Sequence, residues 1–239
     1  MLLYRLRLIS EVKNSMPFNE INKEYVVKYC NNHLPSEEWF EENFDFIKDN
    51  VLRERLVTEF KNVRFMYKLF EGISAKDELL LAEVRLQILM YASIYEAVIH
   101  YLLFEVFKDW EEVKILTVHI IPKKISIPAA KLQRIEKELE HDGKEIVPFF
   151  YSVCKKEITA IRFDDKCKVA EQIGLIDSSL CNELIKIYEI RNGLHMHAEI
   201  RKQIEYELET SRIAYRRMKL FVEQIKIKLK EQKKNVSAI

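Results

Sequence analysis

The scarcity of glycine and proline most restricts what this chain can fold into. Its 239 residues include four glycines and five prolines, too few to supply the turns of a many-stranded protein. Leucine, isoleucine, glutamate and lysine dominate instead, and three of these form helices readily. With 48% hydrophobic residues the chain can bury a substantial core. We therefore predict a mainly helical, folded protein that forms one domain, or one domain with an extension.

Residues 1–73 are predicted to form an N-terminal helical extension. The Ser36 hydroxyl can cap a helix that starts there, because it accepts from backbone amides left free at a helix N-terminus. Apolar residues then recur at spacings of four and three before Gly72 ends the pattern; they are Leu56, Phe60, Val63, Tyr67 and Phe70. The extension should pack on the main bundle, because so short a unit could not hide all its aromatic residues alone; they include Trp39, Phe40, Phe44 and Phe46.

Residues 74–239 are predicted to form the main helical bundle. Residues 74–77 resemble a capping box with Asp77 in place of the usual glutamate, and they would open a long helix to about Phe107. The β-branched run 115–121, followed by a shorter run at 125–127, predicts a small hairpin or an extended loop. Helix should resume near Pro128.

The rest of the bundle is predicted from turn and cap residues. The helix from Pro128 should end at Asp142 and Gly143, and another should start around Pro148, since proline is tolerated at a first helical position. Asp164 and Asp177 are then the expected caps of two further helices. A last helix is predicted over residues 211–235.

This last segment is strongly basic. It holds nine lysines and arginines against two glutamates, a surplus of seven in a chain whose net charge is +1. Such asymmetry fits a helix that binds a polyanion, but it also fits a solvated surface. The near-neutral total argues against tight, nonspecific binding to nucleic acid.

The segment from Arg191 to His197 carries the groups most capable of chemistry. It combines a guanidinium, the Asn192 amide and the imidazoles of His195 and His197 within an apolar helical pattern. Arginine stabilises charge that builds up on a phosphate, and histidine titrates near neutral pH and so can move a proton to or from a ribose oxygen. These groups can cleave RNA without a metal.

The same segment resembles the motif of the HEPN superfamily of helical domains. That motif is an arginine, usually followed by a polar residue, and then a histidine after four to six intervening positions. Arg191, Asn192 and His197 fit it, whereas His195 follows Arg191 too closely. Arg134 and His141 also have a matching spacing, but the Asp142-Gly143 turn makes that pair a surface helix end. The long helix before residue 107 and the two helices before Arg191 are similar to the family's helix order, so the resemblance covers about residues 75–235.

The resemblance implies an all-α, HEPN-like up-and-down bundle that acts as an endoribonuclease of toxin or antiviral-defence type. His197 would be the general acid or base, and Arg191 and Asn192 would hold the phosphate. His195 is held in reserve because it lies closer to Arg191 around an ideal helix, and Glu96 because its helix would line the cleft. The resemblance also implies a homodimer with a composite site, an RNA substrate, and an antitoxin or sensor protein as a possible partner.

Other interpretations remain open. Arg191 could instead pair with Glu189 or Asp177, and His197 could be a core imidazole. A metal held by His195, His197 and Glu199 is disfavoured, because these side chains diverge on a helix. No cofactor motif is present in the sequence. The alternative to an enzyme is a non-catalytic helical module that dimerises or binds a partner.

The cysteines and the apolar segments indicate where in the cell the protein is expected. Cys30, Cys154, Cys167 and Cys181 form no Cys-x-x-Cys pair, which favours reduced core thiols over a zinc or redox site. The first nine residues are apolar but contain two arginines and lead to no small-residue cleavage site. The apolar run around residues 86–107 contains charged groups, which argues against a membrane span. We therefore expect a cytoplasmic protein without membrane contact.

Overall fold

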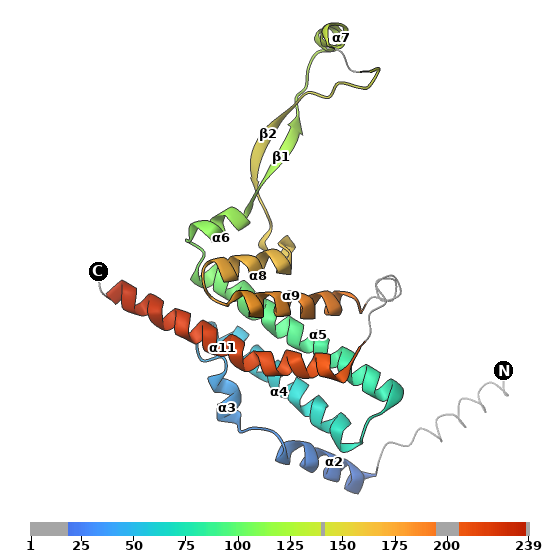
Figure 1. Ribbon diagram of the computed structural model, residues 1–239, viewed down its shortest axis with the longest axis vertical. Helices are drawn as coiled ribbons and strands as arrows, with labels where there is room; N and C mark the ends of the chain where they lie inside the picture. The colour runs from blue at the N-terminus through green and yellow to red at the C-terminus, as the bar shows by residue number, and fades with distance from the viewer. Residues whose placement is uncertain (1–18, 140–141, 195–205, 238–239) are drawn as a thin grey trace, which may run out of the picture. The chain divides into compact units, whose positions relative to one another are not determined.

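The computed structural model describes residues 19–139, 142–194 and 206–237 (Figure 1). In these ranges the protein is mostly helical with one antiparallel pair of strands, which confirms the predicted mainly helical class. The chain divides into two compact units, residues 1–95 with 186–239 (unit 1) and residues 96–185 (unit 2). Both boundaries fall inside helices, α5 (Asp77–Tyr101) and α9 (Ser178–Asn192). The predicted domain boundary after residue 73 and the HEPN-like arrangement stay predictions.

Unit 1 is built from helices. It contains α2 (Glu20–Asn32), α3 (Glu37–Glu42), α4 (Asn50–Gly72), most of α5, the end of α9, and α11 (Leu208–Ser237). The predicted Ser36 cap is confirmed, since the Trp39 amide donates to its hydroxyl at 3.3 Å. Asp49 caps α4 in the same way through the Leu52 amide at 3.0 Å. These caps satisfy amides that the first helical turn leaves free.

The core of unit 1 is an aromatic cluster centred on Phe60, which is 1% exposed. Its ring lies 5.5 Å from that of Phe40 on α3, 6.4 Å from that of Tyr91 on α5 and 6.5 Å from that of Tyr215 on α11. Such edge-to-face and tilted pairs add to the stabilisation from burial alone. The N-terminal aromatic residues therefore pack against the later helices, as predicted.

Gly72 ends α4, as predicted, and the structure supplies a packing reason for glycine there. A Cβ atom at this position would lie 2.7 Å from a ring carbon of Tyr29 on α2. The Tyr29 hydroxyl also donates to Glu71 at 3.2 Å. Any larger residue at this position would require the Tyr29 ring to shift.

The start of α5 differs from the predicted capping box. Ser74 and Asp77 both have φ of 51°, in the left-handed region, whereas a capping residue needs an extended backbone. Asp77 is the first residue of α5 instead of its third. The predicted length is correct, because a π-helical turn, Leu102–Val106, continues the helix to the Phe107 amide, which donates to the Leu102 carbonyl at 2.8 Å.

Within the described residues one helical stretch, Asp77–Val106, is long and apolar enough to cross a membrane by length and composition. In its most apolar window the mean hydropathy is 1.3, and 61% of that window is buried within the protein. A buried core helix meets the same criteria, so this stretch is weak evidence for a membrane span.

Unit 2 combines short helices with the hairpin. After α5 come α6 (Glu111–Leu116), strand β1 (Val118–Lys124), α7 (Ala129–Glu138), strand β2 (Phe149–Lys155), a 3₁₀ turn (Ile158–Ala160), α8 (Phe163–Gln172) and most of α9. Its core lies among α5, the π-helical turn, α6, α8 and α9, where these apolar side chains, among others, are buried: Val98, Leu102, Phe107, Val113, Phe163, Ala170 and Leu184.

The hairpin corrects two predictions. β1 pairs with β2, with Ile120 opposite Val153 and Lys124 opposite Phe149, and not with the run at 125–127. The predicted helix from Pro148 is wrong, because the residues after it form β2. Consecutive aromatic residues at 149–151 favour an extended backbone, and β1 supplies a partner strand.

One predicted helix cap is right and the other is wrong. Asp177 caps α9, since the Leu180 amide donates to its carboxylate at 2.8 Å. Asp164 is the second residue of α8, and its carboxylate accepts from the Arg162 guanidinium at 2.9 Å. Both carboxylates lie near the positive end of a helix dipole, which is why the sequence suggested the same role for each.

Candidate active site at the end of α9

The C-terminal turn of α9 places the predicted arginine and asparagine. The helix ends at Asn192, and the Gly193 amide donates to the carbonyls of Glu189 and Ile190 at 3.0 Å each. The Leu194 amide closes the turn by donating to the Arg191 carbonyl at 3.2 Å. Arg191 and Asn192 therefore lie on the hydrogen-bonded last turn of α9, in unit 1.

The Arg191 guanidinium is held by neutral groups. It lies 5.0 Å from the centre of the Tyr188 ring, and its Nη1 donates to the Asn192 Oδ1 at 3.0 Å and to the Tyr188 hydroxyl at 3.4 Å. Among the described residues no carboxylate forms an ion pair with it, so the alternative pairings with Glu189 and Asp177 are not formed. Its charge is therefore oriented but not neutralised by a nearby carboxylate.

Tyr188 is the residue that the sequence interpretation missed. It precedes Arg191 by three positions on the same helix, a spacing at which side chains are neighbours. An aromatic residue at this spacing was the available signal, because a guanidinium stacks readily on a ring.

The two histidines of the motif cannot be placed beside Arg191. His195 and His197 lie outside the described residues, as does Glu199, the third member of the disfavoured metal set. The described part of the chain, residues 19–139, 142–194 and 206–237, holds no group of three histidine, cysteine or acidic side chains arranged to bind a metal.

Glu96 belongs to unit 2 and contacts a buried lysine. Its Oε1 lies 3.9 Å from the Nζ of Lys166 on α8; the Lys166 side chain is 2% exposed and that of Glu96 is 32% exposed. Burial lowers the pKa of Lys166, and Glu96 opposes this shift. His100, one turn further along α5, has its pKa lowered by burial and then by the Lys166 charge. Glu96 thus has a structural task as counter-charge to Lys166.

The basic helix α11 is partly neutralised. Arg216 lies 2.7 Å and Arg212 3.8 Å from Glu209, and Lys219 lies 3.8 Å from Glu223. Lys226 reaches Asp45, in the turn after α3, at 2.9 Å. These contacts tie part of the basic surplus to the protein's own carboxylates, as a solvated helical surface would.

Arg134 and His141, the other pair with the spacing of the HEPN motif, are only partly described by the structure. Arg134 on α7 forms a helical ion pair with Glu138 at 2.8 Å, and both side chains are exposed. His141 lies outside the described residues. Arg134 therefore has the surface role that was predicted.

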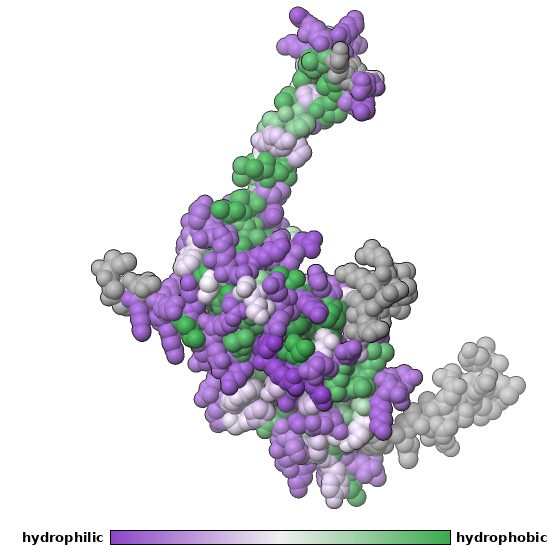
Figure 2. All heavy atoms as spheres, in the orientation of Figure 1, coloured by the Kyte–Doolittle hydropathy of each residue, from purple (hydrophilic) through white to green (hydrophobic). Residues whose placement is uncertain are grey.

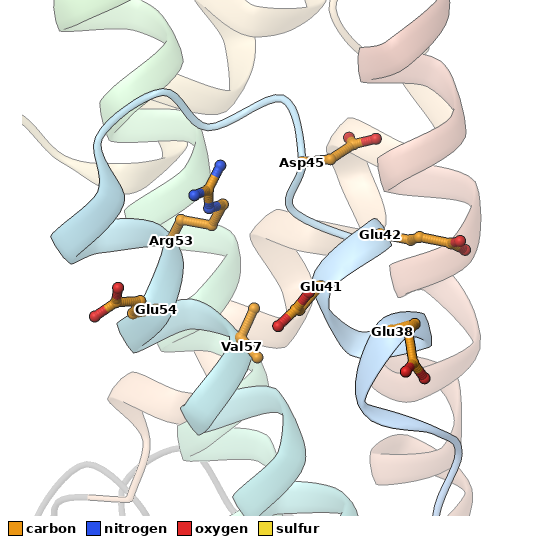
Figure 3. A pocket seen from close by; sticks show the side chains of 7 residues that line it. All are labelled: Glu38, Glu41, Glu42, Asp45, Arg53, Glu54 and Val57. Carbon is orange, nitrogen blue, oxygen red and sulfur yellow. The ribbon is translucent and has the colours of Figure 1, made fainter.

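Unit 1 also contains an acidic hollow (Figure 3). It has a volume of about 450 Å³ and lies between α3 and α4. Its lining is dominated by carboxylates: Glu38, Glu41, Glu42, Asp45 and Glu54, with Arg53 and Val57. Its negative charge does not suit a phosphate ligand, so it does not compete with the end of α9 as a site for RNA chemistry.

Comparison with known proteins leaves the family open. No protein-family model, no curated protein and no solved structure matches this chain.

Proposed function

We propose that the protein is a metal-independent endoribonuclease of HEPN-like type, with Arg191, Asn192 and His197 as its catalytic residues. The observation that carries the proposal is the set of contacts made by the Arg191 guanidinium. Its guanidinium is held by Tyr188 and Asn192, and no carboxylate among the described residues pairs with it. An oriented cation of this kind suits the charge that develops on a phosphate during transfer.

The proposed reaction is an internal transesterification. A base removes the proton of a ribose 2′-hydroxyl, and the 2′-oxygen forms a bond to the adjacent phosphorus. The bond from phosphorus to the 5′-oxygen breaks, and an acid supplies the proton that this oxygen takes up. The products are a 2′,3′-cyclic phosphate and a 5′-hydroxyl, so neither a metal nor an oxidant is needed.

His197 would serve as the acid or base, since imidazole titrates near neutral pH. The reaction needs one acid and one base, and a homodimer in which two motifs meet would supply both. Arg191 would neutralise the phosphoryl oxygens, and the Asn192 amide nitrogen would donate to one of them. His195 and Glu96 remain reserve residues for proton transfer.

We propose a cytoplasmic location, and the toxin or antiviral-defence setting follows from the resemblance alone. HEPN-like ribonucleases often act in toxin or antiviral-defence systems, where an antitoxin or a sensor subunit holds them in check. Single-stranded loops of transfer, messenger or ribosomal RNA would all present a flexible 2′-hydroxyl to the site.

A non-catalytic dimerisation or interaction module is the second candidate. The hairpin of unit 2 favours it, because apolar side chains on its surface are exposed, including Ile120 at 66% and Val153 at 69%. Large exposed apolar patches often mark contacts with other molecules. Under this proposal Arg191 would only terminate α9.

Substitution of Arg191 separates the two candidates. Arg191→Ala should abolish cleavage of total RNA while lowering the melting temperature by less than about 3 °C, because it removes only a half-buried cation–π contact and neutral hydrogen bonds. Arg191→Lys should retain the charge and recover part of the activity. A melting temperature lowered by 10 °C or more, as expected only for a structural arginine, would favour the interaction module.

A further inference from the structure

The hairpin of unit 2 projects from α6 and carries α7 at its far end (Figure 1). We call the two strands, Val118–Lys124 and Phe149–Lys155, the hairpin arm. One face is formed by alternate residues of both strands, including Val118, Ile120, Tyr151 and Val153, and these are all exposed. A hairpin usually turns its apolar face toward a core. The arm instead presents apolar side chains to the surroundings (Figure 2).

Three consecutive aromatic residues lie on the arm. Phe149 is 50% exposed, Phe150 51% and Tyr151 70%. Phe149 and Tyr151 share one face, where their ring centres are 5.4 Å apart, and Phe150 points to the other. Three large rings left this exposed offer flat apolar surfaces for stacking.

Lysines lie directly beside these rings. In the strand register Lys124 is the partner of Phe149 and Lys123 is the partner of Phe150. Lys155 lies at the other end of β2, and neither strand contains an acidic residue. Within the described part of the chain none of these three lysines forms an ion pair, although lysines elsewhere do, such as Lys68 with Glu71 at 2.6 Å. The arm therefore combines exposed rings with unneutralised positive charge.

A hollow lies where the arm meets α7. It has a volume of about 410 Å³, a size that suits a small planar group. Its lining is mostly apolar, with Lys124 and Glu145 as the charged members. Glu145 could accept from the amino group of a base.

Charge decides which partner fits the arm. A second copy could cover the apolar face, but both ends of that face carry lysine, at 124 and 155, so two arms stacked on one another would set lysine against lysine. A polyanion has the complementary charge. Among polyanions, a single-stranded nucleic acid also supplies unpaired bases that stack on aromatic side chains.

We propose that the hairpin arm is a binding surface for single-stranded RNA. Bases stack on Phe149, Phe150 and Tyr151, phosphates contact Lys123, Lys124 and Lys155, and the hollow beside α7 receives one base. The choice of RNA over DNA rests on the proposed ribonuclease function. The arm would thus hold substrate through residues other than those that cleave it.

The test is binding, measured separately from cleavage. Full-length protein carrying Arg191→Ala is titrated into a fluorescein-labelled single-stranded RNA of about 12 nucleotides, and anisotropy is recorded. In this background Phe149→Ala with Tyr151→Ala should weaken binding about 30-fold or more, since each stacked base contributes strongly. Tyr25→Ala is the matched control, because Tyr25 on α2 is 71% exposed, against 70% for Tyr151.

Salt dependence tests the lysines. Lys123→Gln with Lys124→Gln should make the slope of log K against log salt shallower by about 1.4, which is two phosphate contacts on a single strand. Lys28→Gln with Lys76→Gln, which removes two exposed lysines of unit 1, should leave the slope unchanged. Circular dichroism of each variant establishes that it folds.

The outcomes are distinct. Equal RNA affinity for the arm variants and their controls would overturn the inference, and so would an arm variant that loses self-association but binds RNA normally. Preference for single-stranded DNA would also contradict the choice of RNA. If RNA binds through the arm but the unsubstituted protein cleaves nothing, the proposed function fails while the arm surface stands.

Discussion

Replacing Glu96 with glutamine would leave the buried Lys166 ammonium without its counter-charge. Breaking a fully buried ion pair costs about 3–5 kcal/mol. Here the Glu96 side chain is 32% exposed and the Nζ–Oε1 distance of 3.9 Å exceeds a hydrogen bond, so solvent screens part of the interaction. We therefore expect Glu96→Gln to lower the free energy of unfolding by about 2 kcal/mol, or the melting temperature by about 4–8 °C.

Lys166→Met removes the charge that Glu96 serves. Methionine is similar in volume and apolar, and the site is 2% exposed, so this substitution should change stability by less than about 1 kcal/mol or raise it. In the Lys166→Met background Glu96→Gln should then cost almost nothing. The difference between the two backgrounds gives the coupling energy of the pair.

The pH dependence has a definite sign. Burial lowers the pKa of Lys166 in the folded state, so between this value and the ordinary value near 10.4 the unfolded chain binds more protons. Stability from this group therefore rises with pH through that window. The total rise should be larger in Glu96→Gln, which removes the group that opposes the shift, and absent in Lys166→Met.

Urea denaturation followed by circular dichroism measures these energies, and RNA cleavage is recorded on the same samples. If Glu96→Gln leaves the free energy of unfolding unchanged but abolishes cleavage, Glu96 acts in catalysis and the structural argument is refuted. A cost that persists unchanged in the Lys166→Met background would also refute it.

Three further predictions follow from burial. Phe60→Ala should lower the free energy of unfolding by about 3–5 kcal/mol, because the side chain is 1% exposed and contacts rings from α3, α5 and α11; a loss below 1 kcal/mol in urea denaturation would contradict the cluster. His100, whose pKa burial and Lys166 lower, should make stability fall as pH drops through about 6.5, and His100→Phe should reduce that fall in acid melting curves. Under native conditions a thiol reagent should modify half-buried Cys154 first. The buried cysteines, Cys30, Cys167 and Cys181, should react only on unfolding. Burial raises the pKa of Cys181 to about 12, which further lowers its reactivity.

The helices were predictable because their signals are local. The apolar spacing of α4 and the Ser36 and Asp177 caps each depend on residues within one or two turns. The segment from α8 to Arg191 was predicted for the same reason. Asp164 shows the limit of such signals, because an acidic residue in a first turn and an acidic cap are stabilised by the same dipole.

Strand β2 was missed because its partner is distant in sequence. Val153 pairs with Ile120, 33 positions earlier, and the apolar residues around Pro148 have no alternation that distinguishes a strand from a short buried helix. At the candidate site the sequence named Arg191 and Asn192 but not Tyr188, although its spacing of three from Arg191 on one helix was a signal for the cation–π contact. The placement of His195 and His197 lies outside the described residues.

Mapping the ends of cleaved RNA tests the central claim most directly. Purified protein, Arg191→Ala and His197→Ala are incubated with total cellular RNA in EDTA, and the product ends are sequenced by a method specific for cyclic phosphates. We predict 2′,3′-cyclic phosphate ends with the unsubstituted protein and none with either variant. Cleavage that disappears in EDTA, or equal cleavage by all three proteins, would contradict a metal-independent ribonuclease that uses Arg191 and His197.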